Sequence, residues 1–133
     1  MLVHSTTKKE RNIEMKDKIV IGYCRISTSR QNLERQERNI LARYPDALVY
    51  KEVYTGTKIT GRKVWNTVYN LVKKEAGKKD ITIVFDSVSR MSRDAAEGFE
   101  LYKELYNMGV RLVFIKEPHI NTDTYKEQLN KQI

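Results

Sequence analysis

Two short segments of this sequence, residues 23–31 and 86–93, combine hydroxyl side chains with arginines. A guanidinium presents a fork of donors that binds phosphate bidentately, and it stays charged at any working pH. A serine hydroxyl beside such groups is a candidate nucleophile, because the positive charge favours its alkoxide form. The pattern therefore indicates chemistry on a phosphate group, with a serine nucleophile and three phosphate-binding arginines: Ser27, Arg25, Arg90 and Arg93.

The same residues also have a purely structural interpretation. Ser27 precedes a predicted helix, and serine commonly caps helix N-termini, so residue type alone favours the cap over the nucleophile. Arg90 and Arg93 are three residues apart and share one side of a helical turn, but solvated arginines at a helix entrance have the same spacing. Both interpretations stay open on these residues alone.

Other candidate groups are more isolated. His4 and His119 are not placed for a Ser-His pair or a metal site. Asp86 follows a predicted strand and is of the right type for Mg²⁺, but it is a lone carboxylate. The sequence contains neither glycine-rich nucleotide fingerprint, G-x-G-x-x-G or G-x-x-x-x-G-K-[ST]. We expect neither a metal nor a cofactor.

Strands alternating with helices must position the two segments. Apolar, β-branched runs predict strands at residues 18–24, 47–53, 81–85 and 110–115. Apolar residues recurring at three and four predict helices at residues 31–44, 62–76 and 94–108. This order predicts an α/β three-layer sandwich, a mainly parallel central sheet of about four or five strands flanked by helices. Both segments then follow strand ends, where such folds place their sites.

Individual residues refine these elements. Trp65 belongs to the apolar face of residues 62–76 and is predicted to lie in the core. Gly22 in the first strand indicates a close backbone approach, and residues 54–61 are predicted to form a flexible loop of the kind that meets ligands. For residues 94–108 the predicted apolar face is Ala95, Phe99, Tyr102, Leu105 and Tyr106.

Composition bounds the class of protein. The 133 residues suit one domain, and 25 Lys and Arg against 17 Asp and Glu favour a polyanionic partner such as nucleic acid, although a merely basic protein has the same balance. Cys24 is the only cysteine, which excludes an internal disulfide and fits a reducing cytoplasm. No run approaches the roughly 20 apolar residues of a membrane helix. Residues 1–17 are predicted to be a disordered arm.

The first segment resembles a known family. Residues 22–28, Gly-Tyr-Cys-Arg-Ile-Ser-Thr, followed by Gln31 and Gln36, resemble the Y-x-R-[VI]-S-T-x-x-Q-x-x-x-x-Q signature of the resolvase/invertase family of serine recombinases. Gly56 and Arg62 continue the likeness, and residues 89–93 are similar to the family's D-R-L-x-R segment. The resemblance covers most of residues 18–120, which we interpret as a resolvase-like catalytic domain.

The resemblance implies site-specific DNA recombination, in which strands are cleaved and rejoined through a covalent 5′-phosphoserine intermediate on Ser27 while the 3′ hydroxyl leaves. The arginines already named would surround the scissile phosphate, and Arg62 would join them from the loop. Gln31 and Gln36 would help to position the nucleophile and the phosphate. Because the protein link conserves the phosphodiester energy, neither ATP nor a metal is expected.

One position departs from the family pattern. Ser89 stands where the family has Asp before its first arginine, and Asp86 is the nearest carboxylate that can replace it as an auxiliary group. The resemblance further implies a DNA partner, a homodimer built through a long helix, a tetramer at synapsis and a separate downstream DNA-binding domain. Here that helix is expected to start within residues 121–133 and to be cut short, with the DNA-binding domain absent.

Two other functions remain open at this stage. A catalytically silent DNA-binding or assembly module of the same fold is consistent with Ser89 in place of the family's Asp. A flavodoxin-like regulatory domain that binds a small phosphorylated ligand is consistent with the arginines alone.

Overall fold

The computed structural model describes the backbone of residues 16–28, 33–56 and 58–132, and the side chains of these segments up to residue 127. The predicted arm of residues 1–17 lies outside the described residues except at its end. There Lys16 Nζ donates to the Gly77 carbonyl at 2.9 Å, and the Asp80 amide donates to the Asp17 carbonyl at 2.8 Å.

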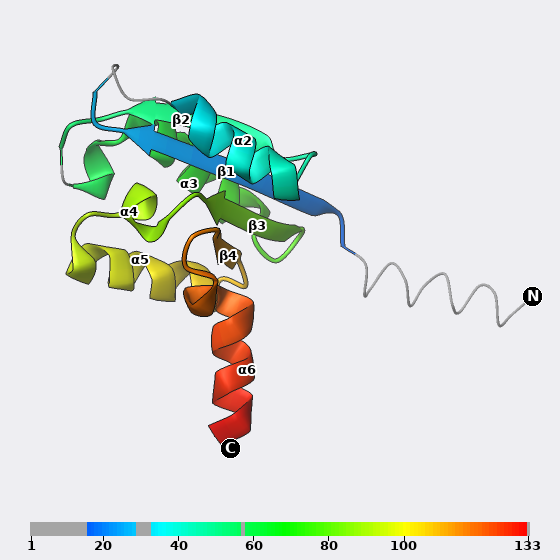
Figure 1. The fold of residues 1–133 in the computed structure, drawn as a ribbon. Coiled ribbons are helices and arrows are strands. Elements are labelled where there is room, and N and C mark those ends of the chain that lie inside the picture. The colour runs from blue at the N-terminus through cyan, green and yellow to red at the C-terminus, as the bar shows by residue number, and fades with distance from the viewer. Residues whose placement is uncertain (1–15, 29–32, 57, 133) are drawn as a thin grey trace, which may run out of the picture.

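Four strands form one parallel sheet in the described part of the chain: β1 (Lys18–Ile26), β2 (Leu48–Val53), β3 (Asp80–Phe85) and β4 (Arg111–Phe114). Their order is β2-β1-β3-β4 (Figure 1). The predicted α/β class and parallel sheet are confirmed. The first strand runs two residues further than predicted, because β2 pairs with it as far as Ile26. Arg25 therefore lies in the strand and not in the loop that follows.

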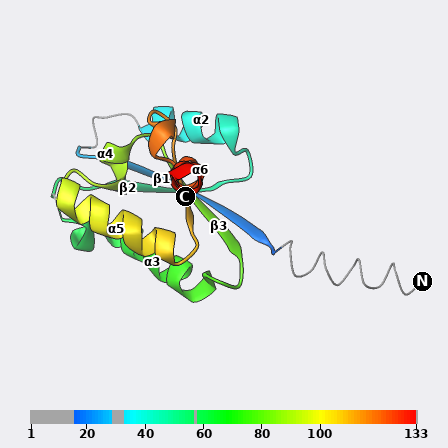
Figure 2. The same cartoon turned by 90° about the horizontal axis from the view of Figure 1, so that it is seen from below.

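Helices cover both faces of the sheet. Helix α2 (Leu33–Arg43) lies on one face, and α3 (Lys63–Glu75) and α5 (Ala95–Asn107) lie on the other (Figures 1 and 2). Helix α6 (Thr122–Gln132) follows β4 and extends away from the body of the domain (Figure 1). Within the described residues, no helix is both long and apolar enough to cross a lipid bilayer.

Alternate residues of the strands fill two apolar layers, as the two-residue repeat of a strand requires. The larger layer joins β1, β3 and β4 to α3 and α5, and it buries Trp65 to 3% exposure, as predicted. The smaller layer lies between the sheet and α2 and contains Cys24, Val84 and, from α2, Ile40. A Cβ at Gly22 would lie 3.0 Å from Ile40 Cγ2. The prediction of close packing at this glycine holds, but side chains and not another backbone approach it.

The predicted apolar face of α5 is only partly correct, since Tyr102 and Leu105 pack on the core. Phe99 is 61% exposed, and of the five predicted residues only Leu105 is buried. The helix buries Gly98 and Leu101 in addition to Leu105. Tyr102 is partly buried and stacks on Phe114 of β4, and both Tyr102 and Tyr106 also meet Tyr125 of α6 edge-on.

The strand order reverses between β1 and β3. The chain leaves β1 through α2 towards β2 and leaves β3 through α5 towards β4, so the connections diverge to opposite sides of the sheet. In open α/β sheets the carboxyl ends at such a reversal form the usual binding crevice. The two segments with hydroxyls and arginines follow these two strand ends.

Candidate active site

Arg25 is the next-to-last residue of β1, and its side chain is completely buried. Its Nε donates to the Arg90 carbonyl at 3.2 Å and its Nη2 donates to the Ser89 carbonyl. Gln36 of α2 holds the backbone of Arg25 on both sides, because Oε1 accepts from the Arg25 amide at 3.1 Å and Nε2 donates to its carbonyl at 2.9 Å. Backbone and side chain of Arg25 are therefore both held in place.

Arg62 shares the Arg90 carbonyl with Arg25 and also reaches the neighbouring carbonyl of Met91. It is the N-cap residue of α3 and is completely buried, and its Nη1 donates to the Met91 carbonyl and, at 3.4 Å, to that of Arg90. The accepting residues belong to a short helix, α4 (Val88–Met91), which the sequence did not predict. Arg25 and Arg62 thus hold the segment that carries Arg90.

Several buried guanidinium donors have no acceptor in the described part of the chain. They are Nη1 of Arg25, Nε and Nη2 of Arg62, and Nε of Arg90. A buried donor without a partner is destabilising, and a charged one more so. An anion with several oxygens is the group that satisfies such a cluster.

Ser27 lies just beyond the end of β1 and is half-buried. Nη2 of the exposed Arg93 donates to its Oγ. Helix α2 is described from Leu33 onwards, and the residues between Ser27 and this point that would decide the capping interpretation lie outside the described ones. The structure brings Ser27 to an arginine.

The positive charges of the site act on one another. Burial, followed by the charges of Arg62 and Arg93, lowers the pKa of Arg25 to about 10. Arg25 is still protonated at neutral pH. Like charges brought together in a poorly solvated place favour an anion beside them.

Asp86 and Ser89, the two auxiliary candidates, make other contacts. The Asp86 carboxylate is 1% exposed and accepts from Asn39 Nδ2 at 2.8 Å, and Lys116 Nζ lies 3.2 Å from its other oxygen. Ser89 Oγ lies 2.9 Å from Ser87 Oγ, and only its carbonyl meets Arg25. Neither side chain has a described hydrogen bond to Ser27.

The remaining predicted groups divide between described and undescribed parts of the chain. Gln31 and His4 lie outside the described residues. His119 lies in the 3₁₀ helix η2 (Pro118–Ile120), between β4 and α6. Gln36 is described, and its described bonds run to the backbone of Arg25.

Glu52 is a functional-site neighbour that sequence reasoning missed. This buried carboxylate of β2 accepts from the Tyr23 hydroxyl and, at 2.9 and 3.1 Å, from the amides of Val64 and Trp65 at the start of α3. Burial, and secondly the bond to Glu52, raises the pKa of Tyr23. Strand pairing sets Glu52 opposite Arg25. Only this pairing of β1 with β2 reveals Glu52 as a neighbour of the site, and neither segment shows it by itself.

Comparison with known proteins gives consistent matches. Residues 20–133 match the family described as "Resolvase, N terminal domain". A transposon Tn3 resolvase from Escherichia coli is 31% identical over 104 residues, 78% of this chain and 53% of the relative. A resolvase/recombinase from Pseudomonas putida is 29% identical over 98 residues, 74% of this chain and 51% of the relative. The chain thus spans about half the length of these curated relatives.

Two solved structures share the fold. The N-terminal catalytic domain of TP901-1 integrase superposes with a TM-score of 0.68 at 19% identity, covering 86% of this chain and 88% of that one. A resolvase family site-specific recombinase from Streptococcus pneumoniae gives a TM-score of 0.58 at 20% identity, covering 88% and 90%. At these identities the likeness bears on the fold, and the arrangement of the arginines around Ser27 must carry the chemistry.

Proposed function

Because this chain belongs to the family of resolvase N-terminal domains, we propose that it cleaves and rejoins DNA strands in site-specific recombination, with Ser27 as the nucleophile. One observation carries the proposal. Ser27 Oγ accepts a hydrogen bond from Arg93 at the strand-order reversal, beside buried arginine donors without an acceptor in the described residues. That combination suits a phosphodiester better than a neutral ligand.

The proposed reaction is a transesterification at phosphorus. Ser27 Oγ loses its proton and forms a bond to phosphorus, and the P–O3′ bond breaks with its electron pair on the departing 3′ oxygen, which takes up a proton. The 5′ phosphate stays on Ser27 as a phosphodiester. Attack by a 3′ hydroxyl on this link reverses each step and releases Ser27, so rejoining needs no outside energy source.

The arginines fall into two groups in this mechanism. Arg93 contacts the nucleophile itself, and its charge favours the alkoxide. Arg25 and Arg62 hold the carbonyls of residues 89–91 and so place Arg90, and their buried donors without an acceptor add positive charge to the site. Preorganised donors of this kind stabilise the extra negative charge of the five-coordinate transition state.

In this proposal Asp86 anchors neighbouring parts of the chain and does not transfer a proton. Its carboxylate joins α2, through Asn39, to the segment after β4, through Lys116. Ser89, which stands where the family has its acid, has its hydroxyl paired with that of Ser87. Gln36 positions the backbone of Arg25, and through it the strand that leads to Ser27.

The proposed partners are DNA and further copies of the same chain. The net charge of +8 supports the first. Helix α6, which extends from the body of the domain (Figure 1), supports a homodimer and a tetramer at synapsis. A separate downstream DNA-binding domain stays a prediction from the resemblance. The buried, unpaired thiol of Cys24 supports a cytoplasmic setting.

Trapping the covalent intermediate tests the proposal. The chain is incubated with random-sequence DNA duplexes that carry a bridging sulfur at the 3′ position, because a 3′ thiol leaves readily and rejoins poorly. Denatured protein is then examined by mass spectrometry for a nucleotide on Ser27. We expect the adduct in the parent chain, its loss in Ser27→Ala, and a fall of about 10²-fold or more in its rate in Arg25→Ala.

Thr67→Ala is the matched control, since it removes an exposed hydroxyl whose described hydrogen bond runs to the Lys63 carbonyl of its own helix. Its adduct should equal that of the parent. An adduct that persists in Ser27→Ala contradicts the proposal. DNA binding without any adduct in the parent chain supports the catalytically silent module instead, and binding of small phosphates without DNA binding supports the regulatory domain.

A further inference from the structure

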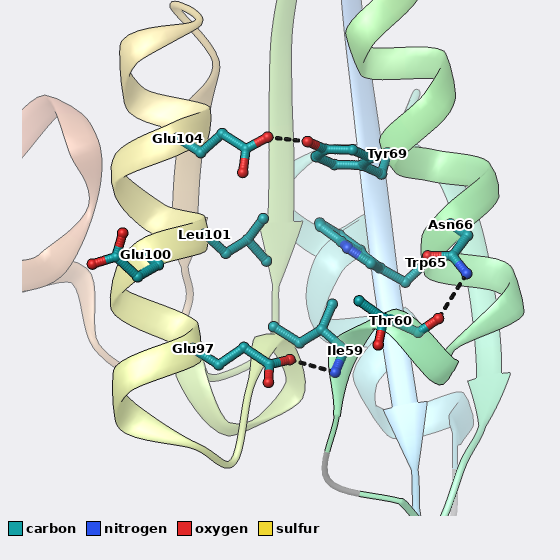
Figure 3. A pocket seen from close by; sticks show the side chains of 9 residues that line it. All are labelled: Ile59, Thr60, Trp65, Asn66, Tyr69, Glu97, Glu100, Leu101 and Glu104. Carbon is teal, nitrogen blue, oxygen red and sulfur yellow. Dashed lines mark hydrogen bonds between the residues drawn. The ribbon is translucent and has the colours of Figure 1, made fainter.

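We propose that Glu97 of α5 is a positioning residue for Arg62: it anchors the turn that precedes Arg62 and so holds the guanidinium at the site. The inference rests on the proposed function, since it concerns the arginine that the mechanism uses. Glu97 belongs to neither of the two segments that carry the site, and the connection is visible only in three dimensions (Figure 3).

The start of α5 leaves the Glu97 carboxylate free for this task. Asp94 is the N-cap residue and accepts from the Glu97 amide at 3.1 Å, which is half of a capping box. In the full motif the third-position Glu returns to the amide of the cap residue. Here Ser92 Oγ accepts from the Asp94 amide at 3.1 Å instead. The carboxylate can therefore reach another element.

That element is the 3₁₀ helix η1 (Ile59–Gly61), whose first amide needs an acceptor. The first amides of a helical turn have no partner within the turn, and the preceding residue, Lys58, makes no side-chain cap. Glu97 Oε1 accepts from the Ile59 amide across a sequence separation of 38 residues. A charged acceptor makes this bond stronger than one between neutral groups.

The anchored turn connects directly to Arg62. The Ile59 carbonyl accepts from the Arg62 amide at 3.0 Å, so two hydrogen bonds on one residue join Glu97 to the backbone of Arg62. The fully buried Arg62 guanidinium donates to the carbonyls of Arg90 and Met91, which lie in the segment that precedes α5. Glu97 and Arg62 thus tie the same two parts of the chain together at two points.

Packing around the anchor agrees with this role. Ile59 is 6% exposed and lines a groove of about 290 Å³ between α3 and α5, together with Trp65 and Leu101. Figure 3 shows Glu97 turned towards Ile59, whereas Glu100, which also lines the groove, has its carboxylate turned away from Ile59. A second bond, from Asn66 Nδ2 to the Thr60 carbonyl at 3.0 Å, holds the turn against α3. The turn is set between the two helices by both polar and apolar contacts.

Two spectroscopic readouts test the anchor without DNA. Nitrogen-15 NMR of the 133-residue chain reports the exchange of the Ile59 amide and the Nε–H signal of buried Arg62, which is identified by its loss in Arg62→Lys. In Glu97→Ala we expect Ile59 to exchange about tenfold faster and the Arg62 signal to shift and broaden. Glu97→Gln keeps an acceptor oxygen and should retain both signals.

The adduct assay supplies the functional arm. Glu97→Ala should slow adduct formation about tenfold at saturating DNA, with little change in the DNA concentration for half-maximal rate, and Glu97→Gln should restore most of the rate. If Glu97 acts through Arg62, adding Glu97→Ala to the Arg62→Ala variant will not slow its adduct formation any further. Glu100→Ala is the matched control on the same helix, since its described ion pair joins only Lys103.

The outcomes separate this inference from the proposed function. An unchanged Arg62 signal and Ile59 exchange in Glu97→Ala overturn the inference, as does an equal further loss of rate in the Arg62→Ala background. A parent chain that forms no adduct counts against the proposed function alone, because the NMR readouts still decide whether Glu97 holds Arg62.

Discussion

At the scale of single residues, the carboxylate of Glu52 joins three elements at one point. It links the Tyr23 hydroxyl on β1 to the amides of Val64 and Trp65 at the start of α3. Arg62 is the N-cap residue of the same helix, two positions before Val64. Buried acceptors that satisfy several donors are costly to remove, because every donor then loses its partner. Glu52 therefore bears on both stability and the placement of Arg62.

Glu52→Ala should lower the free energy of unfolding by about 2–3 kcal/mol, since a charged acceptor is lost and its buried donors stay behind. Urea denaturation followed by the fluorescence of Trp65, the only tryptophan, measures the change. Lys51→Ala is the control on the adjoining position of β2, where an exposed ion pair to Glu37 is lost and the midpoint should barely move. Equal midpoints for the two variants would contradict the assignment.

The residues of the site were only partly predictable. Ser27 and Arg93 were found from their types and are in contact, because both belong to segments that follow adjacent strands. Asp86 was a reasonable auxiliary acid by position, yet Asn39 and Lys116 occupy its carboxylate. Such partners come from remote parts of the chain, and no spacing rule within a segment reveals them.

At the scale of elements, the contact of β1 with α2 depends on the missing side chain of Gly22. A Cβ there would approach Ile40 Cγ2 to 3.0 Å and Val49 Cγ2 to 3.3 Å. Gly22→Ala should therefore destabilise the fold by about 1–3 kcal/mol through overpacking. In a double-mutant cycle with Ile40→Ala, measured by urea denaturation, the double variant should lose less unfolding free energy than the sum of the two single losses. Strict additivity would mean that the helix shifts away without cost.

The outer edge of β4 is closed by side chains at the start of α6. The Leu112 amide donates to Thr122 Oγ1 at 3.0 Å and the Phe114 amide donates to Asn121 Oδ1 at 2.7 Å. Open strand edges invite pairing with another chain, and these two bonds cover the edge. They also join the root of α6 to the sheet.

Thr122→Val keeps the shape of this buried side chain but removes the acceptor, so the Leu112 amide should exchange with solvent about tenfold faster. Thr122→Ser should keep the protection. Thr124→Val serves as the control, because the Thr124 hydroxyl donates to the Pro118 carbonyl and not to the strand. Exchange at Leu112 is followed by NMR, and unchanged protection in Thr122→Val would show that the edge is held by packing alone.

Elements with a strong local pattern were predicted well, and elements held by remote contacts were not. The strands and the three long helices were recognised because apolar periodicity is written within each segment. Helix α4 was missed because four residues are too few to show a periodicity. It is held by remote contacts, since Glu117 accepts from its first amide and Arg25 and Arg62 donate to its last carbonyls. The face of α5 was only partly predicted, because Phe99 is exposed and Tyr106 contacts Tyr125 of α6, and no pattern within α5 indicates either.

At the scale of the whole molecule, the net charge of +8 predicts how DNA binding responds to salt. Each phosphate that a cationic group neutralises releases condensed counterions, so the logarithm of the binding constant falls linearly with the logarithm of salt concentration. The binding constant for a short duplex, measured by fluorescence anisotropy over a series of salt concentrations, gives this slope. A slope close to zero would contradict the proposal that DNA is the partner.

Matched arginine variants locate the phosphate contact on the molecule. Arg93→Ala should make the slope shallower by about one phosphate contact, because this exposed guanidinium lies beside Ser27. Arg111→Ala removes an equal charge from β4, where Asp80 and Asp123 lie 4.0 and 3.8 Å away, and should leave the slope unchanged. Equal effects of the two variants would mean that DNA responds to the overall charge and not to the site. A loss confined to Arg93 places the DNA backbone against the carboxyl ends of β1 and β3, where a phosphate must lie for Ser27 to attack it.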